Sequence, residues 1–222
     1  GSYNAGSISS HIPLTSNIAL ATKSRLLAID YRLAPEHVFP AAVDDALAAY
    51  RWLLAQNIDP KRIVVAGDSA GGGLVLALLL ALRDKAMPLP AAAVCLSAWT
   101  DLTCSGESWT KNAKADFMLK LIPTVQSAEI YLGDVDPRTP LASPLFGDLR
   151  GLPPILMQVG SNEIILSDST LFAEKAKSAG VDVTLEVWKD MQHEWQYAAS
   201  WLPEGRQALA KIGEFVSQHC PN

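Results

Sequence analysis

The sequence predicts an α/β fold, with a mostly parallel, doubly wound sheet flanked by helices. Short apolar runs of strand length alternate along the chain with segments of helical periodicity, as in a parallel sheet with helical connections. Four of the five apolar runs lack in–out alternation, as strands buried on both faces do. The chain has 222 residues, of which 49% are hydrophobic, so it can bury one large core. We therefore expect residues 1–222 to form a single domain.

The five apolar runs are the predicted strands. In chain order they are Leu26–Tyr31, Ile63–Gly67, Ala92–Ser97, Ile155–Gly160 and Val183–Trp188. In the last run apolar side chains alternate with polar ones, so we expect that strand to lie half-exposed near an edge of the sheet. Because an exposed edge strand invites pairing, Val183–Trp188 is also the expected contact of a homodimer.

The segments between the strands carry helix signals. Apolar residues recur at three- and four-residue steps from Val43 to Leu54, directly after Pro40. Residues 70–85 are apolar nearly all round, so we expect that helix to be buried. Two further helices are predicted over residues 167–179 and from about residue 203 onward.

The stretch from 100 to 154 is irregular. Proline and glycine are scattered through it, and only residues 119–132 suggest a helix. A segment of this length is too long for a plain connection between strands. We expect it to lie near the active site.

Residues Gly67–Gly71 read Gly-Asp-Ser-Ala-Gly, a G-x-S-x-G pentapeptide between a predicted strand and a predicted helix. A serine on such a turn is held in a strained conformation with an exposed hydroxyl, which makes Ser69 the candidate nucleophile. The N–H of Ala70, at the helix N-terminus, points at a forming oxyanion. The alternative is a helix cap rich in serine and glycine.

A serine needs a base, and the chain has four histidines, at positions 11, 37, 193 and 219. In hydrolases with this kind of turn the chain order is serine, then acid, then histidine. His193 follows the last predicted strand in a short loop, so it is the candidate base. The alternative for His193 is a solvated loop histidine.

The acid that orients the base is expected after residues 155–160, which leaves two candidates. Glu163 lies three residues past the end of that predicted strand. Asp168 falls in the first turn of the next helix, where a carboxylate is explained by the helix dipole alone. Position therefore favours Glu163, with Asp168 as the alternative acid.

Six short motifs, spread over nearly the whole chain, carry a family resemblance. They are Asp30–His37, Phe39–Ala42, Gly67–Leu74, Leu96–Leu102, Ala142–Pro144 and Met191–His193. In this order they resemble the hormone-sensitive-lipase family of bacterial esterases (family IV). The resemblance implies an α/β-hydrolase fold with a triad on Ser69 and His193. Residues 159–163 resemble a subgroup whose acid is glutamate, which supports Glu163.

The family resemblance also predicts an HGGG motif that this sequence does not contain. In the family that loop supplies further oxyanion N–H donors, and the strand before it lies inside the sheet. Gly1-Ser2 is either the tail of the motif, which makes Gly1 a second oxyanion donor, or a cloning remnant. We expect the native protein to carry the missing segment. Otherwise the neighbouring strands pair directly, or the strand comes from another chain or from a cleaved N-terminal fragment of this protein that stays bound.

We expect a carboxylesterase that hydrolyses short-chain acyl esters through an acyl-enzyme, with no metal and no organic cofactor. One alternative is a non-catalytic ligand binder, as in the plant gibberellin receptors that resemble these esterases. Another alternative is an enzyme with the same triad that cleaves a different bond, such as an amidase, lactonase or deacetylase.

Composition limits the partners and the compartment. Eighteen basic and 23 acidic side chains give a formal net charge of −5, which argues against nucleic-acid binding. No apolar run is long enough to cross a membrane. The three cysteines have no CxxC spacing, which indicates a reducing compartment, and we expect a cytoplasmic protein.

Overall fold

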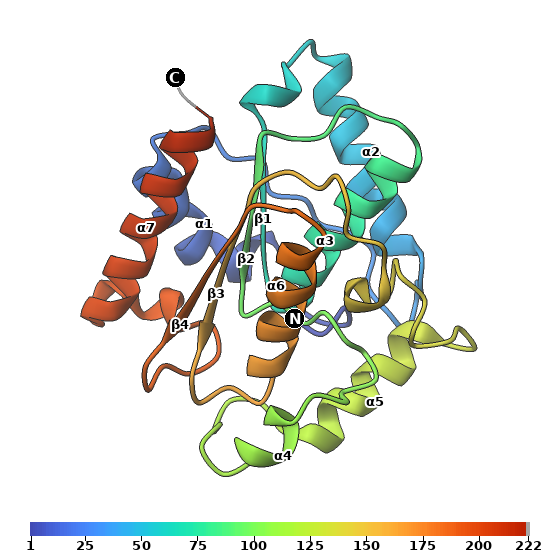
Figure 1. The fold of residues 1–222 in the computed structure, drawn as a ribbon, viewed down its shortest axis with the longest axis vertical. Helices are drawn as coiled ribbons and strands as arrows, with labels where there is room; N and C mark the ends of the chain where they lie inside the picture. Colours follow the sequence, from blue (N-terminus) through green and yellow to red (C-terminus); the bar gives the residue numbers. More distant parts are fainter. Residues whose placement is uncertain (221–222) are drawn as a thin grey trace.

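The computed structural model describes residues 1–220, and its centre is a parallel sheet of four strands (Figure 1). The strands are β1 (Val64–Asp68), β2 (Ala92–Leu96), β3 (Ile155–Gly160) and β4 (Val183–Trp188), and they pair in chain order. The predicted α/β class is confirmed, and four of the five predicted strands are present within a residue or so of their expected bounds.

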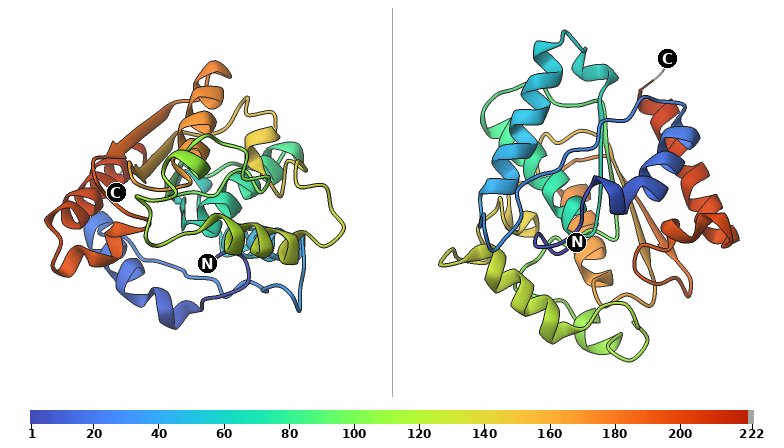
Figure 2. Two further views of the ribbon diagram at one scale, coloured as in Figure 1. Left: turned by 90° about the horizontal axis from the view of Figure 1, so that it is seen from below. Right: turned by 180° about the vertical axis from the view of Figure 1, so that it is seen from behind.

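Helices cover both faces of the sheet (Figure 2). Helices α2 (Ala41–Ala55), α3 (Ala70–Asp84) and α6 (Leu166–Ser178) lie on one side, and α1 (Ile8–Thr22) and α7 (Pro203–His219) lie side by side on the other. Strand β2 shows why both faces are apolar. Its Ala93 and Cys95 pack in the cluster of α3 and α6, whereas Val94 and Leu96 pack in the cluster of α7.

The segment predicted as a strand over Leu26–Tyr31 is not one, and this expectation is wrong. It runs without strand pairing, because within the described residues β1 hydrogen-bonds to β2 alone. A strand exists only through its hydrogen-bonded neighbour. Direct pairing of these residues with β1, one of the alternatives considered above, is therefore not what the structure shows. At the opposite edge β4 is a terminal strand, as predicted, and Val187 is 47% exposed.

Helix α1 had no counterpart in the sequence analysis, partly because Pro13 lies within it. Its start is well capped. The Ser7 side chain accepts from the Ser10 N–H, and the Ser10 side chain in turn bonds the Ser7 N–H. Leu14 and Ile18 pack toward α7, so tertiary packing stabilises the helix.

The first part of the irregular stretch, residues 100–132, lies at the carboxyl end of the sheet, where the strands lead into their loops, and the remainder runs back toward the start of β3 (Figure 1). It carries α4 (Ser108–Lys111) and α5 (Leu121–Leu132), the second of which matches the helix expected there. Three short 3₁₀ turns complete the chain: η1 (Pro60–Arg62), η2 (Pro144–Phe146) and η3 (Trp195–Ser200). None of the helices in residues 1–220 combines the length and apolar character needed to cross a bilayer.

Candidate active site

Ser69 lies on the sharp turn between β1 and α3. Its backbone angles, φ 53° and ψ −118°, are strained for a residue with a side chain. Backbone bonds hold the turn, because the Ser69 N–H donates to Leu96 at 2.8 Å and the Ser69 carbonyl accepts from Trp99 at 3.0 Å. A Cβ at Gly67 would meet the Gly71 carbonyl oxygen at 2.2 Å, so only glycine fits two positions before the serine.

The glycines after Ser69 let α3 pack closely against the loop that follows β2. A Cβ at Gly72 would lie 2.7 Å from the Ala98 side chain, and one at Gly73 would lie 2.2 Å from the Trp99 carbonyl oxygen. At Gly71 the nearest such atom is a carboxylate oxygen of Asp68, 3.9 Å away. Close packing therefore falls on the second and third glycines of this run.

His193 lies between the hydroxyl of Ser69 and the carboxylate of Glu163. Its Nε2 is 3.0 Å from Ser69 Oγ, and its Nδ1 is 2.9 Å from Glu163 Oε2. An ionised carboxylate only accepts, so in the neutral ring the proton belongs on Nδ1 and Nε2 accepts from the serine. The structure thus brings together the three residues that the sequence analysis named.

The carboxylate of Glu163 is fully buried and firmly held. Its Oε1 accepts from Ser97 Oγ at 2.8 Å and from the Gly160 N–H at 2.5 Å, which leaves Oε2 for the histidine. Asn112 donates its side-chain amide to the Glu163 carbonyl at 2.8 Å. These bonds fix the carboxylate at the end of β3.

Asp168, the alternative acid, faces a different part of the molecule. Its carboxylate accepts the N–H groups of Thr100 and Asp101, both at 3.0 Å, and the indole N–H of Trp109 at 3.1 Å. Burial, helped by the charge of Asp101, raises the pKa of Asp168 to about 8. Asp168 joins the start of the irregular segment to α6, and the carboxylate at His193 belongs to Glu163 instead.

The charge state of His193 depends on the carboxylates around it. Burial lowers its pKa, but the bond to Glu163 and the charges of Glu163, Glu194 and Asp116 outweigh that effect and raise the pKa to about 9. The surrounding carboxylates therefore stabilise the protonated ring relative to a histidine in water. A base with these neighbours is strong once it has lost its proton.

The two predicted oxyanion donors differ in their positions. Ala70 is the first residue of α3, so its N–H has no acceptor within the helix and stands directly after Ser69. The Gly1 amino group donates to the Ala5 carbonyl at 2.5 Å, and no hydrogen bond within residues 1–220 joins Gly1 to Ser69. Gly1 as an oxyanion donor stays a prediction.

The sequence analysis missed several residues that shape the site. Asp116 is fully buried, and its carboxylate accepts the N–H groups of Met118, Leu119 and Ile164. It thereby ties the irregular segment to the loop that carries Glu163. Ser97 and Asn112 were missed for the same reason, because their partners are distant in the chain and no local pattern marks them.

Two exposed apolar side chains lie beside the loop of His193. Phe117 is 71% and Met118 is 56% exposed. Gln192 joins this segment to the histidine loop, because its side chain accepts from the Phe117 N–H at 3.2 Å and donates to the Ala115 carbonyl at 3.0 Å. The approach to the site is therefore partly apolar.

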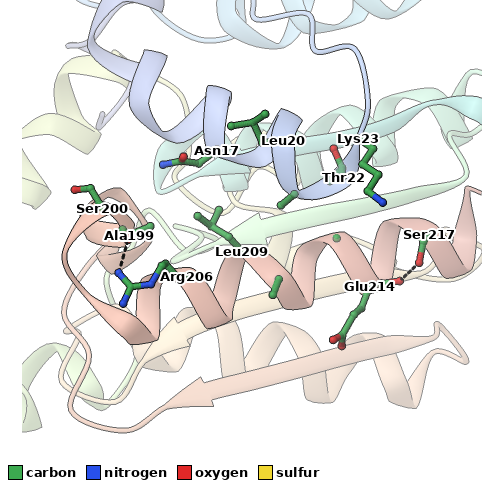
Figure 3. A pocket seen from close by; sticks show the side chains of 13 residues that line it. Asn17, Leu20, Thr22, Lys23, Ala199, Ser200, Arg206, Leu209, Glu214 and Ser217 are labelled. Atoms are coloured by element: carbon green, nitrogen blue, oxygen red, sulfur yellow. Dashed lines mark hydrogen bonds between the residues drawn. The ribbon is translucent and has the colours of Figure 1, made fainter.

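A groove of about 800 Å³ lies elsewhere, between α1 and α7 (Figure 3). Side chains such as Leu20, Leu209 and Arg206 line it, and Ser69, Glu163 and His193 are not among its lining residues. The candidate active site therefore rests on the hydrogen-bonded groups at the ends of the strands and not on this groove.

Comparison with known proteins gives a consistent result. A family model described as the α/β-hydrolase fold matches residues 1–197. An acetyl-hydrolase of Streptomyces hygroscopicus is 50% identical over 216 residues, which covers 97% of this chain and 72% of that protein. An esterase of Acinetobacter venetianus is 41% identical over 98% of this chain and 72% of its own length. A crystal structure of an esterase from the bacterial hormone-sensitive-lipase family superposes with a TM-score of 0.98 at 54% identity, covering 99% of this chain and 74% of the other.

Proposed function

The chain belongs to the hormone-sensitive-lipase family of α/β hydrolases and is a carboxylic ester hydrolase, and we propose that it cleaves short-chain acyl esters through an acyl-enzyme on Ser69. The observation that carries this proposal is the unbroken chain of hydrogen bonds from Ser69 through His193 to Glu163. The name of the acetyl-hydrolase relative supports a small acyl group.

In the first half of the reaction Ser69 Oγ attacks the ester carbonyl carbon, and its proton passes to Nε2 of His193. The carbonyl oxygen becomes an oxyanion, to which the Ala70 N–H is directed. When the tetrahedral intermediate collapses, the bond to the alcohol oxygen breaks. His193 then gives its proton to the leaving alcohol, and the acyl group stays on Ser69.

In the second half a water molecule takes the place of the alcohol. His193 accepts a proton from the water, the resulting hydroxide attacks the acyl-enzyme, and the protonated histidine returns the proton to Ser69. Glu163 keeps the ring in the productive tautomer and stabilises the imidazolium. The products are a carboxylic acid and the free enzyme.

The test compares hydrolysis of p-nitrophenyl acetate, butyrate and octanoate by this chain and by its Ser69→Ala variant. We expect the acetate and butyrate rates to exceed the octanoate rate, and the variant to lose at least about 10³-fold in kcat. Equal rates for the two proteins would overturn the proposal and favour the non-catalytic binder. Cleavage of the matching anilide at a rate comparable to the ester would favour the amidase instead.

We also propose a homodimer through the edge of β4, supported by the exposed Val187 on that terminal strand. Sedimentation velocity of the protein and of a Val187→Lys variant tests it, since a charge at the edge should release monomers. A sedimentation coefficient of a monomer for both proteins would refute the dimer.

The remaining partner and location proposals rest on composition. The net charge of −5 supports a protein that does not bind nucleic acid, which a gel-shift assay with duplex DNA and with RNA would check. The cysteines are free thiols in the described structure, which supports the cytoplasm as the compartment. Cell fractionation would test that location.

A further inference from the structure

A second carboxylate faces the catalytic histidine, on the side opposite Glu163. Glu194 Oε1 lies 3.6 Å from Nε2 of His193, the nitrogen that also contacts Ser69. At this distance the carboxylate is too far for a hydrogen bond and does not displace the serine, but its charge acts strongly on the ring. The left-handed backbone of Glu194 (φ 57°, ψ 37°) places the side chain there, and its N–H donates to Ser97 Oγ at 3.3 Å.

Asp68, the residue before the nucleophile, is a second acid whose charge acts on Glu194. Nε2 of His11 lies 3.3 Å from Oδ2 of Asp68, and the nearby Asp68 carboxylate raises the pKa of His11. The serine turn, the histidine loop and α1 thus meet in one polar cluster next to Nε2.

We propose that Glu194 is a positioning residue for the esterase reaction: its carboxylate faces Nε2 of His193 and stabilises the imidazolium that forms when Ser69 loses its proton. This inference rests on the proposed function of Ser69 and His193. Glu194 touches neither substrate nor the serine in this role and acts only through the histidine ring. Glu163 holds Nδ1 and Glu194 faces Nε2, so the ring lies between two acids.

The charge states of the pair fit this role. Burial raises the pKa of Glu194 to about 7, and the nearby Asp68 carboxylate adds to that rise. Burial also tends to raise the pKa of Asp68, but the interactions with His11 and Glu194 outweigh it and lower that pKa. With a pKa of about 7, Glu194 is ionised in the more alkaline range where His193 loses its own proton.

Other charged groups also face this cluster. Glu163 and Asp116 act on His193 from the loop after β3 and from the irregular segment. Around the carboxylate pair, the further titratable groups are His11, Tyr31, Tyr197 and the chain's amino group. Among the described residues, however, the carboxylate of Glu194 is the only one that lies within 4 Å of His193 Nε2.

The experiment measures kcat and KM for p-nitrophenyl butyrate from about pH 5 to about pH 10 in the unmodified chain and in Glu194→Gln. Without the negative charge the histidine becomes a weaker base that loses its proton earlier. We expect the midpoint of the acid limb of kcat to move down by up to about one pH unit, and the alkaline plateau to fall several-fold. KM should change little, because Glu194 does not bind substrate.

Asp190→Asn is the matched control. Asp190 lies in the same loop, is exposed, and its replacement changes the net charge by the same amount, but its carboxylate does not face Nε2. Its profile should overlay that of the unmodified chain. Glu194→Asp, which keeps the charge on a shorter side chain, should give an intermediate midpoint and so guards against a folding defect in the Gln variant. Melting temperatures of all variants check folding.

An unchanged midpoint and plateau in Glu194→Gln would overturn the inference, as would an equal shift in Asp190→Asn. Both outcomes are distinct from failure of the proposed function. If the proposed function fails, the unmodified chain shows no hydrolysis rate that depends on Ser69. A chain with such a rate and a Glu194→Gln profile identical to its own would refute this inference alone.

Discussion

Glu163 and Asp168 lie five positions apart and both carboxylates are buried, yet only Glu163 contacts the histidine. In Glu163 one oxygen takes the bonds from Ser97 and Gly160, and the other is left for His193. In Asp168 backbone and indole N–H groups occupy both oxygens. Burial alone therefore does not make a carboxylate a triad acid. What matters is an oxygen that the fold leaves open toward the histidine.

The largest expected effect separates the two acids by activity. Glu163→Gln should lower kcat by about 10⁴-fold, because an amide holds the histidine in the wrong tautomer, as in the serine protease triad. Steady-state rates with p-nitrophenyl butyrate measure this. Asp168→Asn is the matched control and should keep its kcat per folded molecule. Loss of activity in Asp168→Asn together with retained activity in Glu163→Gln would contradict the assignment of Glu163 as the acid that orients His193.

The next effect separates them by stability. Asp168→Ala should lower the free energy of unfolding by about 3 kcal/mol, since three buried N–H donors lose their acceptor. Urea denaturation followed by circular dichroism measures the loss. A change below about 0.5 kcal/mol would show that water replaces the carboxylate and that the bonds contribute little.

The pH dependence of stability sharpens the contrast further. The folded pKa of Asp168 is raised to about 8, whereas an unfolded Asp titrates near 4, so between these values the folded state binds more protons. The contribution of Asp168 to the free energy of unfolding therefore falls as the pH rises through this window, by about 1.4 kcal/mol per pH unit at most. Urea titrations at several pH values should show a steeper fall for the unmodified chain than for Asp168→Asn. Parallel curves would contradict the raised pKa.

The smallest effect concerns the hydroxyls that support each acid. Ser97→Ala removes one bond to Glu163 and should lower kcat about tenfold, equivalent to about 1.4 kcal/mol. Ser108 lies in the neighbouring network, where its hydroxyl donates to the Ile164 carbonyl and accepts from the Ser167 N–H. Ser108→Ala should instead lower the melting temperature and leave kcat unchanged. Equal kcat values in Ser97→Ala and Ser108→Ala would show that Ser97 does not support catalysis.

Local signals made part of this molecule predictable. Strand and helix periodicity placed four strands and the main helices, and the turn at Ser69 together with chain order singled out His193. Glu163 was preferred because it stands just past a strand end, and the structure places it against His193. Asp168 sits in a helical first turn, where the dipole already explains a carboxylate.

The rest depended on contacts between distant residues. Leu26–Tyr31 has the composition of a strand, but pairing is a property of its neighbours and not of its own residues. Asp116 and Ser97 find their partners far along the chain, so no spacing marks them. Glu194 follows the histidine directly, but only its left-handed backbone turns the side chain back toward Nε2.

The glycines that follow Ser69 also bear on how relatives of this chain should be searched for. The G-x-S-x-G pattern requires glycine at position 71, although the structure leaves room there for a methyl group. The pattern does not include positions 72 and 73, where the structure leaves no such room. In a saturation library selected for ester hydrolysis, alanine should survive at Gly71 and be lost at Gly72 and Gly73. A search profile weighted toward the later pair would retain sequences that the pentapeptide discards and would reject chance matches that it accepts.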